Sequence, residues 1–592
     1  MNYDLNKLAE DARKQSTGGK KPSAWASLKT LWPLVAPERK AMLLALAAII
    51  LNAIINLLAP VLIGYSIDHQ VAKGDFKGVL IMAGALLGIF LIGLFVSYRQ
   101  MLLMGSVGQR VLFKLRNTIF AKLQALPMAF FIQNKSGDLI SRINNDTEKL
   151  HQFLAESLTR FMGNLFIMLG AGVFVMVLNW KLGLMTIVPA LLLLAFSRLI
   201  SGWMRERNAA SLKGMGSLSA EIQESLEHFR VIVAFNRRDY FRRRFEEANQ
   251  ANYNASIKAG VANGLFTPVY ELMYHLAQLG VLALGIAMIT QGEISIGLLI
   301  AYISYVSRFY DPLRQIAMLW SSFQLALASW ERISVMMGLE NDLPVLEAAA
   351  QTEDVTSLLR FEQVSFHYPD GPNVLHQVSF NLEPGKTYAF VGPTGGGKST
   401  TAALMARLYD PTAGQILLNG RDLRAYTPQQ RALKIGFILQ EPFLFSGTVY
   451  DNLVYGNPEC QALSSEALTQ RIESAGLSQL LSRFEQGLDT PASSENLSLG
   501  QKQLLAFMRA VLREPDLLIL DEATANIDTI TEQLLEACLR QLPVKTTRVI
   551  IAHRLNTIEA ADEIFFVNGG QITPAGSLDH ALKMLMHEQR AS

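Results

Sequence analysis

A glycine-rich segment in the second half of the chain has the spacing of a phosphate-binding loop. Residues 392–399 match the pattern G-x-x-x-x-G-K-[ST], after an apolar run and before a helical pattern over residues 400–408. Glycines let backbone N–H groups turn toward phosphate, and a helix N-terminus adds positive potential. In such a loop Lys398 reaches the β- and γ-phosphates and Ser399 binds Mg²⁺. The segment therefore predicts a site for Mg·ATP. Its expected nucleotide-binding residues are Gly392, Pro393, Thr394, Gly395, Gly396, Gly397, Lys398, Ser399 and Thr400.

Two adjacent carboxylates follow a second apolar run, residues 517–520. In a P-loop protein, an aspartate at the position of Asp521 holds Mg²⁺ directly or through water. A glutamate immediately after it, Glu522, can polarise the attacking water as a general base. An apolar strand ending in acids is ambiguous by itself, but behind a P-loop it predicts ATP hydrolysis.

Buried strands are expected to carry these groups. Short apolar runs separated by Gly, Pro and Asp turns occupy residues 359–361, 374–382, 387–391, 517–520 and 549–551. Their composition is typical of a parallel sheet buried on both faces. We therefore predict an α/β P-loop nucleotide-binding domain over residues 359–592, after a linker at residues 331–358.

The first half of the chain is far more apolar. A helix needs about 20 apolar residues to cross a bilayer, and the uncharged runs 41–67, 78–98 and 161–180 are long enough. Three further spans are expected at about 182–197, 259–289 and 294–325; the last contains Arg308, Asp311 and Arg314. The prediction is a six-helix membrane domain over residues 41–330.

Charge asymmetry orients these spans. The long segments 105–160 and 198–258 are rich in Arg and Lys, whereas the other connectors are short and weakly charged. By the positive-inside rule, the long segments and both termini are cytoplasmic, which predicts a multi-pass protein of the cell inner membrane. The long segments also look helical and should continue the membrane helices. Residues 1–40 are expected to hold a polar N-terminus without a signal peptide and an interfacial helix with Trp25 and Trp32.

Polar residues inside the expected spans are candidates for a substrate pathway. Glu271 and His275 are four residues apart and share a helix face. Ionisable groups at membrane depth usually face a bundle interior or water. The alternative is a position near the membrane edge or a structural hydrogen bond. Asn52 and Asn56 raise the same question, although polar residues often simply join helices.

Composition excludes several classes of protein. The 592 residues are 50% apolar and 18% charged, and the net charge is +2. A nearly neutral chain shows no sign of nucleic-acid binding. Two cysteines, Cys460 and Cys538, predict neither a disulfide framework nor a cysteine-based metal site.

Further motifs around the P-loop resemble those of ATP-binding-cassette (ABC) proteins. Leu497-Ser-Leu-Gly-Gln501 resembles the family's signature, and Gln440, Asp528 and His553 stand where the Q-loop, D-loop and switch residues are expected. Tyr368 lies where the family places an aromatic residue under adenine. The membrane half resembles that of ABC exporters, with residues 130–142 and 235–245 similar to its two coupling regions.

The resemblance implies roles for these residues. Gln440 would touch Mg²⁺ or water, and His553 would contact the γ-phosphate. Ser498, Gly500 and Gln501 would face ATP held by another subunit, with Asp528 nearby. Glu522, His553 and Gln440 are thus the expected catalytic residues, and Ser399, Gln440 and Asp521 the expected metal-binding ones. Because the family closes ATP between two cassettes, a chain with one cassette implies a dimer in the lipid bilayer.

Two differences from the family's motifs bear on whether the partner subunit is identical to this chain. Leu499 stands where the usual signature has Gly, and the segment 490–496 before it is about two residues shorter than the family's loop. In heterodimeric exporters, one subunit often pairs an intact catalytic Glu with an altered signature. This favours a heterodimer over a homodimer; neutral drift at Leu499 is the alternative.

The expected function is ATP-driven efflux of amphipathic small molecules. Lipid or peptide export, import of metal chelates by an exporter-like fold, and an ATP-gated regulator without transport remain alternatives. A shared fold cannot name the cargo.

Overall fold

The computed structural model describes residues 3–5, 7–8, 32–341, 343–346, 357–369, 371–493, 496–521, 528–551, 558–577, 579–581 and 583–584. The chain divides into two units by its contacts. A helical unit contains Asp11–Lys122 and Gly137–Met337, and the second unit contains Met1–Glu10, Leu123–Ser136 and Gly338–Ser592. Trp25, Leu28 and Leu31 of the predicted interfacial helix lie outside the described residues, whereas residues 32–38 are helical.

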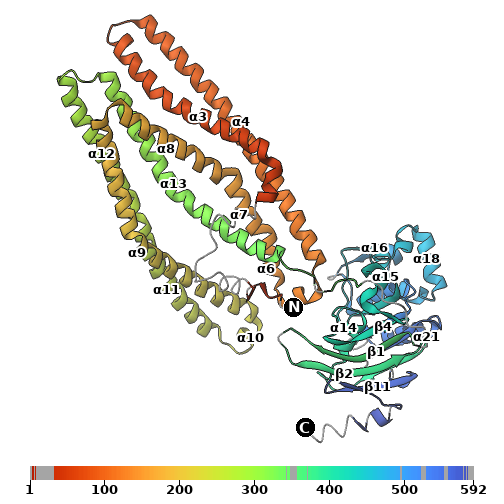
Figure 1. Cartoon of the computed structure of the whole chain (residues 1–592). Helices are drawn as coiled ribbons and strands as arrows, with labels where there is room; N and C mark the ends of the chain where they lie inside the picture. Colours follow the sequence, from red (N-terminus) through yellow and green to blue (C-terminus); the bar gives the residue numbers. More distant parts are fainter. Residues whose placement is uncertain are drawn as a thin grey trace. The chain divides into compact units, whose positions relative to one another are not determined.

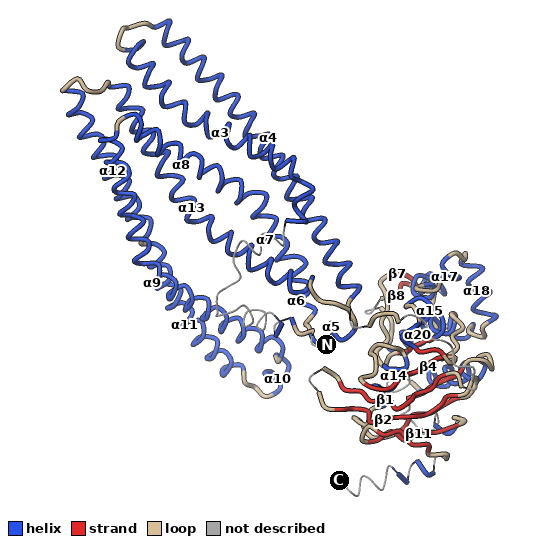
Figure 2. The backbone as a smooth tube through the Cα atoms, viewed as in Figure 1, coloured by secondary structure: helices blue, strands red, loops and turns tan. Residues whose placement is uncertain are grey.

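Long helices build the helical unit (Figures 1 and 2). They are α3 (Arg39–Ser66), α4 (Phe76–Ala125), α8 (Leu158–Leu178), α9 (Trp180–Glu227), α11 (Arg238–Gly264), α12 (Phe266–Thr290) and α13 (Ile296–Met337). Shorter helices are α6 (Ser136–Ser141), α7 (Thr147–Gln152) and α10 (Phe229–Ala234), and π-helical turns occupy Ile67–Val71, Arg142–Asp146 and Phe153–Ser157. Since α4 and α9 run without a break for 50 and 48 residues, the membrane helices do continue into the charged segments.

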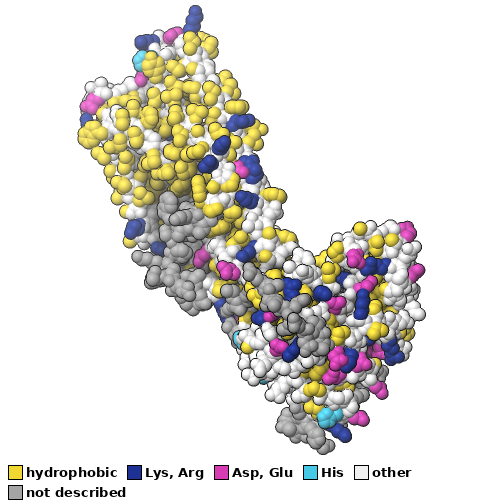
Figure 3. Space-filling model, turned by 45° about the vertical axis from the view of Figure 1, so that its right-hand side comes forward, with side chains coloured by type: hydrophobic (Ala, Val, Ile, Leu, Met, Phe, Trp, Pro, Cys, Tyr) yellow, Lys and Arg dark blue, Asp and Glu magenta, His cyan; other side chains and the backbone are white. Residues whose placement is uncertain are grey.

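Five helical stretches among the described residues are long and apolar enough to cross a membrane: Trp32–Val71, Phe76–Ala125, Ser136–Leu178, Trp180–Glu227 and Arg238–Thr290. The sixth predicted span lies in α13, where Arg308 and Asp311 lower the mean hydropathy. Hydrophobic side chains gather over the surface of this unit (Figure 3), as a lipid-facing surface requires. The predicted helical membrane domain is confirmed.

The fifth predicted span, residues 259–289, lies within the membrane-length stretch Arg238–Thr290, which has a one-residue break at Leu265. Helix α11 ends at Gly264 and α12 begins at Phe266. Proline cannot donate a backbone hydrogen bond, and its ring clashes with the carbonyl four residues earlier. Pro268 stands four residues after Gly264, which accounts for the break.

Three buried tyrosines fix α13 among its neighbours. The hydroxyl of Tyr302 donates to the carbonyls of Val175 and Asn179, that of Tyr305 to Leu57, and that of Tyr310 to Thr186. Each hydroxyl meets a partner in an apolar interior, where an unpaired one would be costly. Helix α13 is thereby bound to α3, α8 and α9.

The second unit contains two larger sheets. The first is antiparallel, in the order β2 (Asn373–Leu382), β1 (Leu359–His367), β4 (Ala413–Leu418), β5 (Arg421–Asp422). The second has the order β12 (Gln571–Pro574), β11 (Glu563–Asn568), β3 (Thr387–Val391), β10 (Thr547–Ile551), β9 (Leu517–Asp521), β6 (Ile435–Ile438). A short pair joins β7 (Gly447–Thr448) to β8 (Pro491–Ala492). The predicted α/β nucleotide-binding domain is confirmed.

Helices complete this unit. They are α5 (Met128–Gln133), α14 (Lys398–Met405), α15 (Pro428–Lys434), α16 (Val449–Val454), α17 (Pro458–Gln461), α18 (Ser465–Ser474), α19 (Ser478–Leu481), α20 (Leu499–Val511) and α21 (Thr529–Gln541). The aromatic rings of Phe361, Phe380, Phe390 and Phe565 pack between the two larger sheets. Strands β3, β6, β9 and β10 are mutually parallel along their common sheet.

The N-terminal residues belong to this unit and pack beside α5. Tyr3 and Leu5 are fully buried. Their backbone N–H groups donate to the side chains of Gln133 (2.7 Å) and Asn134 (3.1 Å), and Asn134 Nδ2 donates back to the Tyr3 carbonyl (2.9 Å). The Tyr3 hydroxyl reaches the carbonyl of Glu340 at 3.0 Å. Residues near the start of the chain thus bind the start of the linker.

Candidate nucleotide-binding site

Parallel strands gather the predicted site residues at one edge of the sheet. Phe390 and Asp521 both align with Ile551 of β10, and Ile438 aligns with Leu520. The carboxyl ends of these strands therefore lie side by side, which is where open α/β sheets bind ligands. The P-loop follows β3, Asp521 ends β9, and Gln440 comes two residues after β6.

The P-loop requires glycine for two reasons, a left-handed backbone conformation and close contact with a neighbouring strand. Gly397 has φ +115°, in the left-handed region that side chains disfavour. A Cβ on Gly392 or Gly396 would lie 2.0 or 2.6 Å from the Val567 carbonyl oxygen of β11. The loop therefore packs directly on the neighbouring strand and turns sharply into α14.

Lys398 begins α14 and is buried. Its Nζ donates to the carbonyls of Gly392 (2.9 Å) and Pro393 (3.0 Å). These bonds hold the ammonium group against the first two residues of the loop, which continues through Thr394 and Gly395. A cation held by loop carbonyls at a helix N-terminus favours an anionic ligand there.

Ser399 and Asp521 meet across the edge of the sheet. Ser399 Oγ donates to Asp521 Oδ1 at 3.1 Å, so the two predicted metal-binding residues are adjacent. Mg²⁺ typically takes one or two protein oxygens and fills its octahedron with water and substrate phosphates. A hydroxyl and a carboxylate beside a P-loop fit that requirement.

Tyr368 lies just after β1 and contacts the P-loop helix. Its hydroxyl is 3.1 Å from Thr400 Oγ1, and its ring packs edge-on against Phe366 and Tyr409. Burial raises the pKa of Tyr409 to about 12. The prediction did not include Tyr409, although an aromatic residue shortly after the P-loop helix was visible in the sequence.

The signature residues form the start of α20. Ser498 Oγ accepts from the Gln501 N–H (3.2 Å), and Gln501 Oε1 accepts from the Ser498 N–H (3.0 Å). This is a capping box, which satisfies two N–H groups at the helix start. Gly500 faces Asp528 and Thr531, since a Cβ there would lie 3.3 Å from an oxygen of each. The Leu499 side chain is 41% exposed, so the departure from glycine does not disturb the fold.

Asp528 is the N-cap of α21 and accepts hydrogen bonds from Thr531. Its carboxylate accepts from the Thr531 hydroxyl (2.7 Å) and backbone N–H (3.0 Å). These hydrogen bonds lower the pKa of Asp528. The D-loop aspartate therefore has a structural role in this chain, next to Gly500 of the signature.

The structure leaves part of the predicted catalytic set undescribed. Gln440 is exposed after β6. Glu522 and His553 lie outside the described residues, each directly beyond or near the end of a described strand, β9 or β10. Their roles stay predictions.

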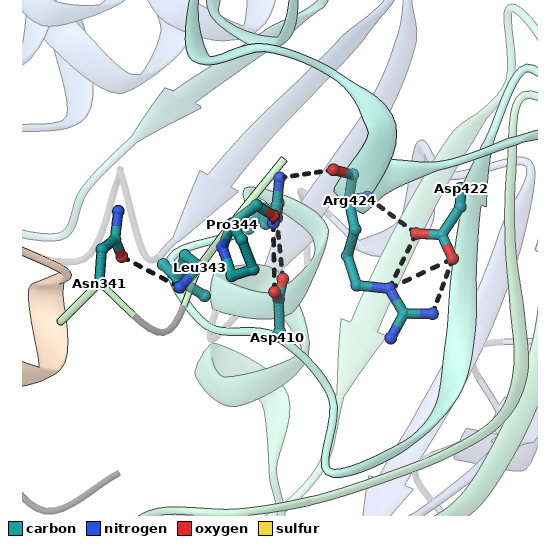
Figure 4. Close-up of polar contacts among 7 residues, drawn as sticks. Asn341, Leu343, Pro344, Asp410, Asp422 and Arg424 are labelled. Atoms are coloured by element: carbon teal, nitrogen blue, oxygen red, sulfur yellow. Dashed lines mark hydrogen bonds and ion pairs between the residues drawn. The ribbon is translucent and has the colours of Figure 1, made fainter. Parts of the chain in front are cut away.

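Two arginines that sequence reasoning missed hold the site's framework. Arg407, just after α14, is buried with φ +52°. It donates to the carbonyls of Pro344 (2.8 Å) and Arg424 (3.1 Å) and pairs with Asp410 (2.8 Å), among the polar contacts drawn in Figure 4. Arg509 in α20 binds the segment that follows Gln440. No spacing in the sequence distinguishes these two arginines from exposed ones.

Both candidate substrate residues lie on the same membrane helix. Glu271 and His275 are exposed on α12, and His275 Nδ1 is 3.3 Å from Gln278 Oε1 on the same helix. A polar contact between membrane helices occurs elsewhere: Arg308 of α13 donates to Asn56 of α3 at 3.0 Å. Both residues stand out in the sequence as polar side chains in apolar runs, but nothing in the sequence indicates that they meet.

Comparisons with known proteins match both units. The family model described as "ABC transporter transmembrane region" matches residues 42–313, and the model described as "ABC transporter" matches residues 375–525. A fatty acid ABC transporter ATP-binding/permease protein of Mycobacterium bovis is 31% identical over 85% of this chain and 79% of its own length. A multidrug resistance ABC transporter ATP-binding and permease protein of Lactococcus lactis is 31% identical, covering 81% of each chain. An ATP-dependent lipid A-core flippase of Pectobacterium atrosepticum is 28% identical over 94% of this chain and 95% of its own.

Proposed function

Because this chain belongs to the exporter-type half-transporters of the ABC transporter family, we propose that it exports amphipathic small molecules across the cell inner membrane. It is a multi-pass ATPase that works as a dimer. We assign transport to residues 41–330 and ATP hydrolysis to residues 359–592, with both termini in the cytoplasm. The observation that carries the proposal is the 3.1 Å contact between Ser399 and Asp521 beside the P-loop, in a chain whose other unit consists of membrane-length helices.

Each residue of the site has its own role in binding or hydrolysing ATP. The backbone of residues 392–397 and the Lys398 ammonium bind the phosphates, and Tyr368 packs beside the adenine. Ser399, Asp521 and Gln440 would hold Mg²⁺, which when bound would neutralise charge on the phosphates. Glu522 takes a proton from the attacking water, and His553 orients the γ-phosphate. The signature residues Ser498, Gly500 and Gln501 serve the nucleotide bound to the partner subunit.

ATP drives the cycle through differential affinity. A ligand shifts a conformational equilibrium only as far as it binds one state more tightly than the other. Two P-loops and two signatures can enclose nucleotide only when the cassettes meet, so bound ATP favours the closed dimer. Hydrolysis removes the contacts that held it closed.

We favour a heterodimer. Leu499 alters the signature that this chain contributes, whereas its P-loop, Asp521 and Glu522 are intact. Its own P-loop would then form the active site with the partner's signature. A homodimer remains the alternative.

A second cargo class has support from the relatives. The names of the Mycobacterium bovis and Pectobacterium atrosepticum relatives specify a fatty acid and lipid A-core, whereas that of the Lactococcus lactis relative specifies multidrug resistance. Lipid export is therefore the alternative to export of small amphipathic molecules.

The test is vectorial transport by the dimer reconstituted in vesicles. ATP should drive uptake of an amphipathic fluorescent dye into vesicles whose cassettes face outward, and Glu522→Gln should bind ATP with little turnover. Asp562→Asn is the matched control, because Asp562 lies at the other end of β3, where it accepts from the Thr387 N–H. Normal ATPase activity in Glu522→Gln would refute the assigned base. ATPase activity without uptake of any compound would refute export.

A further inference from the structure

A positive charge lies at the centre of the helical unit, where α13 contacts α3. Arg308 donates to Asn56 Oδ1 at 3.0 Å, and Asn56 Nδ2 donates to Asn52 Oδ1 at 3.0 Å. Asn56 precedes the end of α3 at Ser66 by ten residues, and Arg308 follows the start of α13 at Ile296 by twelve. At about 1.5 Å per residue, both lie roughly 15–18 Å from their helix ends. That is about half of a hydrocarbon core roughly 30 Å thick.

The charge of Arg308 is not neutralised by its partner. Arginine stays protonated in proteins and has five N–H donors, whereas Asn56 is neutral and accepts one of them. Across the described residues of the helical unit, no Asp or Glu forms an ion pair with Arg308. Asp311, three residues further along, is exposed on α13. An ionisable residue at membrane depth without a counter-charge is a functional candidate.

The surroundings of this charge are amides and apolar side chains. Gln315, two helical turns after Arg308, accepts from Asn164 of α8 at 3.2 Å. One turn before Arg308, the ring of Tyr305 stacks on Phe174 of α8, with 5.5 Å between the ring centroids. A guanidinium with neutral hydrogen-bonding neighbours suits an anion such as carboxylate or phosphate. These two aromatic rings, on the same side of α13 as Arg308, provide apolar surface for a hydrocarbon chain.

We propose that Arg308, positioned by Asn56, binds the anionic head group of an amphipathic substrate, a carboxylate or phosphate attached to a hydrocarbon chain. The inference rests on the proposed export function and narrows its substrate class. An amphipathic cation would place like charge against Arg308 and would be disfavoured.

Stimulation of ATPase activity tests the charge preference. The dimer, reconstituted in zwitterionic lipid vesicles, is titrated with dodecanoate, dodecyl phosphate, dodecanol and dodecyltrimethylammonium, which share one chain and differ in head group. One or both anions should stimulate ATP hydrolysis at lower concentration than the alcohol or the cation. The two anion arms distinguish carboxylate from phosphate recognition. Stimulation by the cation at equal or lower concentration would overturn the proposal.

Variants separate binding from a structural role. Arg308→Gln should raise the anion concentration for half-maximal stimulation by about tenfold or more, the loss expected for a charged hydrogen bond. Asn56→Asp keeps a hydrogen-bond partner for Arg308 and adds a negative charge beside it. If Arg308 had only a structural role, this variant would keep its anion stimulation of ATP hydrolysis. We expect Asn56→Asp to weaken anion stimulation as Arg308→Gln does.

The matched control is Arg314→Gln, which removes an exposed charge from the same helix. It should leave anion stimulation unchanged. Wild-type anion response in Asn56→Asp would overturn the proposal even if Arg308→Gln failed to fold. Export of cations or neutral compounds alone would refute the anion site and leave the export function standing, whereas failure to export any compound would refute export itself.

Discussion

The guanidinium of Arg509 donates two hydrogen bonds to Asn452, one to its backbone carbonyl (2.9 Å) and one to its side-chain Oδ1 (2.7 Å). Arg509 also donates to the Phe443 carbonyl at 3.1 Å and lies over the rings of Phe445 and Tyr455. Phe443 follows Gln440 by three residues. Arg509 therefore connects the signature helix α20 to the segment that follows Gln440.

Removing this arginine should destabilise the nucleotide-binding unit. Burial, with Arg513 nearby, lowers the pKa of Arg509 to about 10, so it is still charged at neutral pH. Arg509→Ala would remove two charged hydrogen bonds to the buried Asn452, whose Oδ1 would keep only the weaker bond from the Phe445 N–H (2.9 Å), at an expected cost of about 2–4 kcal/mol in the free energy of unfolding. Arg540→Ala, an exposed change on α21, should stay within about 0.5 kcal/mol. Denaturant unfolding of the purified full-length protein measures both, and equal stabilities would exclude the role given to Arg509.

Mg²⁺ dependence should follow the Ser399–Asp521 contact. Asp521→Asn and Ser399→Ala each remove one expected metal-binding oxygen. We expect the Mg²⁺ concentration for half-maximal ATPase activity to rise by about 10- to 100-fold, as when groups supporting a metal site are removed. Binding of a fluorescent ATP analogue without Mg²⁺ should change little. Unchanged Mg²⁺ dependence in Asp521→Asn would argue against metal binding there.

A substitution in the signature of this chain tests whether the partner subunit is a second copy of the chain or a different one. Gly500→Asp places a negative charge where the partner's nucleotide would bind. If the dimer is a heterodimer whose active site uses this chain's P-loop, Gly500→Asp should retain most ATPase activity, whereas Lys398→Ala should abolish it. In a homodimer both changes abolish activity. A thermal melt of Gly500→Asp checks the fold, because a Cβ at this position meets oxygens of Asp528 and Thr531 at 3.3 Å.

The Asp528 cap predicts a pH dependence of stability. Hydrogen bonds from Thr531 lower its pKa in the folded protein below the ordinary value of 3.8. The ionised carboxylate therefore stabilises the fold fully above that value, and the contribution disappears as the pH falls through the lowered folded pKa. Asp528→Asn has no such titration. The difference in melting temperature between wild type and Asp528→Asn should be constant above about pH 5 and vanish in strong acid. A difference that persists there would exclude the carboxylate as its source.

Local sequence patterns were enough to locate the nucleotide site. A P-loop is a contiguous run, so its glycines and Lys398 carry their spacing in the chain. Asp521 could be placed beside Ser399 because it ends an apolar strand, and parallel strands present their carboxyl ends together. The helical membrane domain was predictable from three long uncharged runs, with three weaker spans beside them.

Contacts between distant elements were not predictable in this way. Arg509 and Asn452 lie 57 residues apart, and their contact depends on how α20 packs. Arg308 and Asn56 were each conspicuous as polar residues in apolar runs, yet pairing them requires the packing of α13 on α3, which hydropathy does not specify. The break between α11 and α12 depends on Pro268. Hydropathy does not reveal it, because proline does not interrupt the apolar character of the run.

The docking of Tyr3 on the Glu340 carbonyl has a consequence for how the chain is made. The two residues are separated by 337 positions, so the contact cannot form until the entire membrane domain has been synthesised. At about 5–20 residues per second, translation takes roughly 20–70 s to cover that distance. During this interval Tyr3 and Leu5 lack part of their final site, and a nascent chain stalled before residue 340 should leave its first residues open to protease.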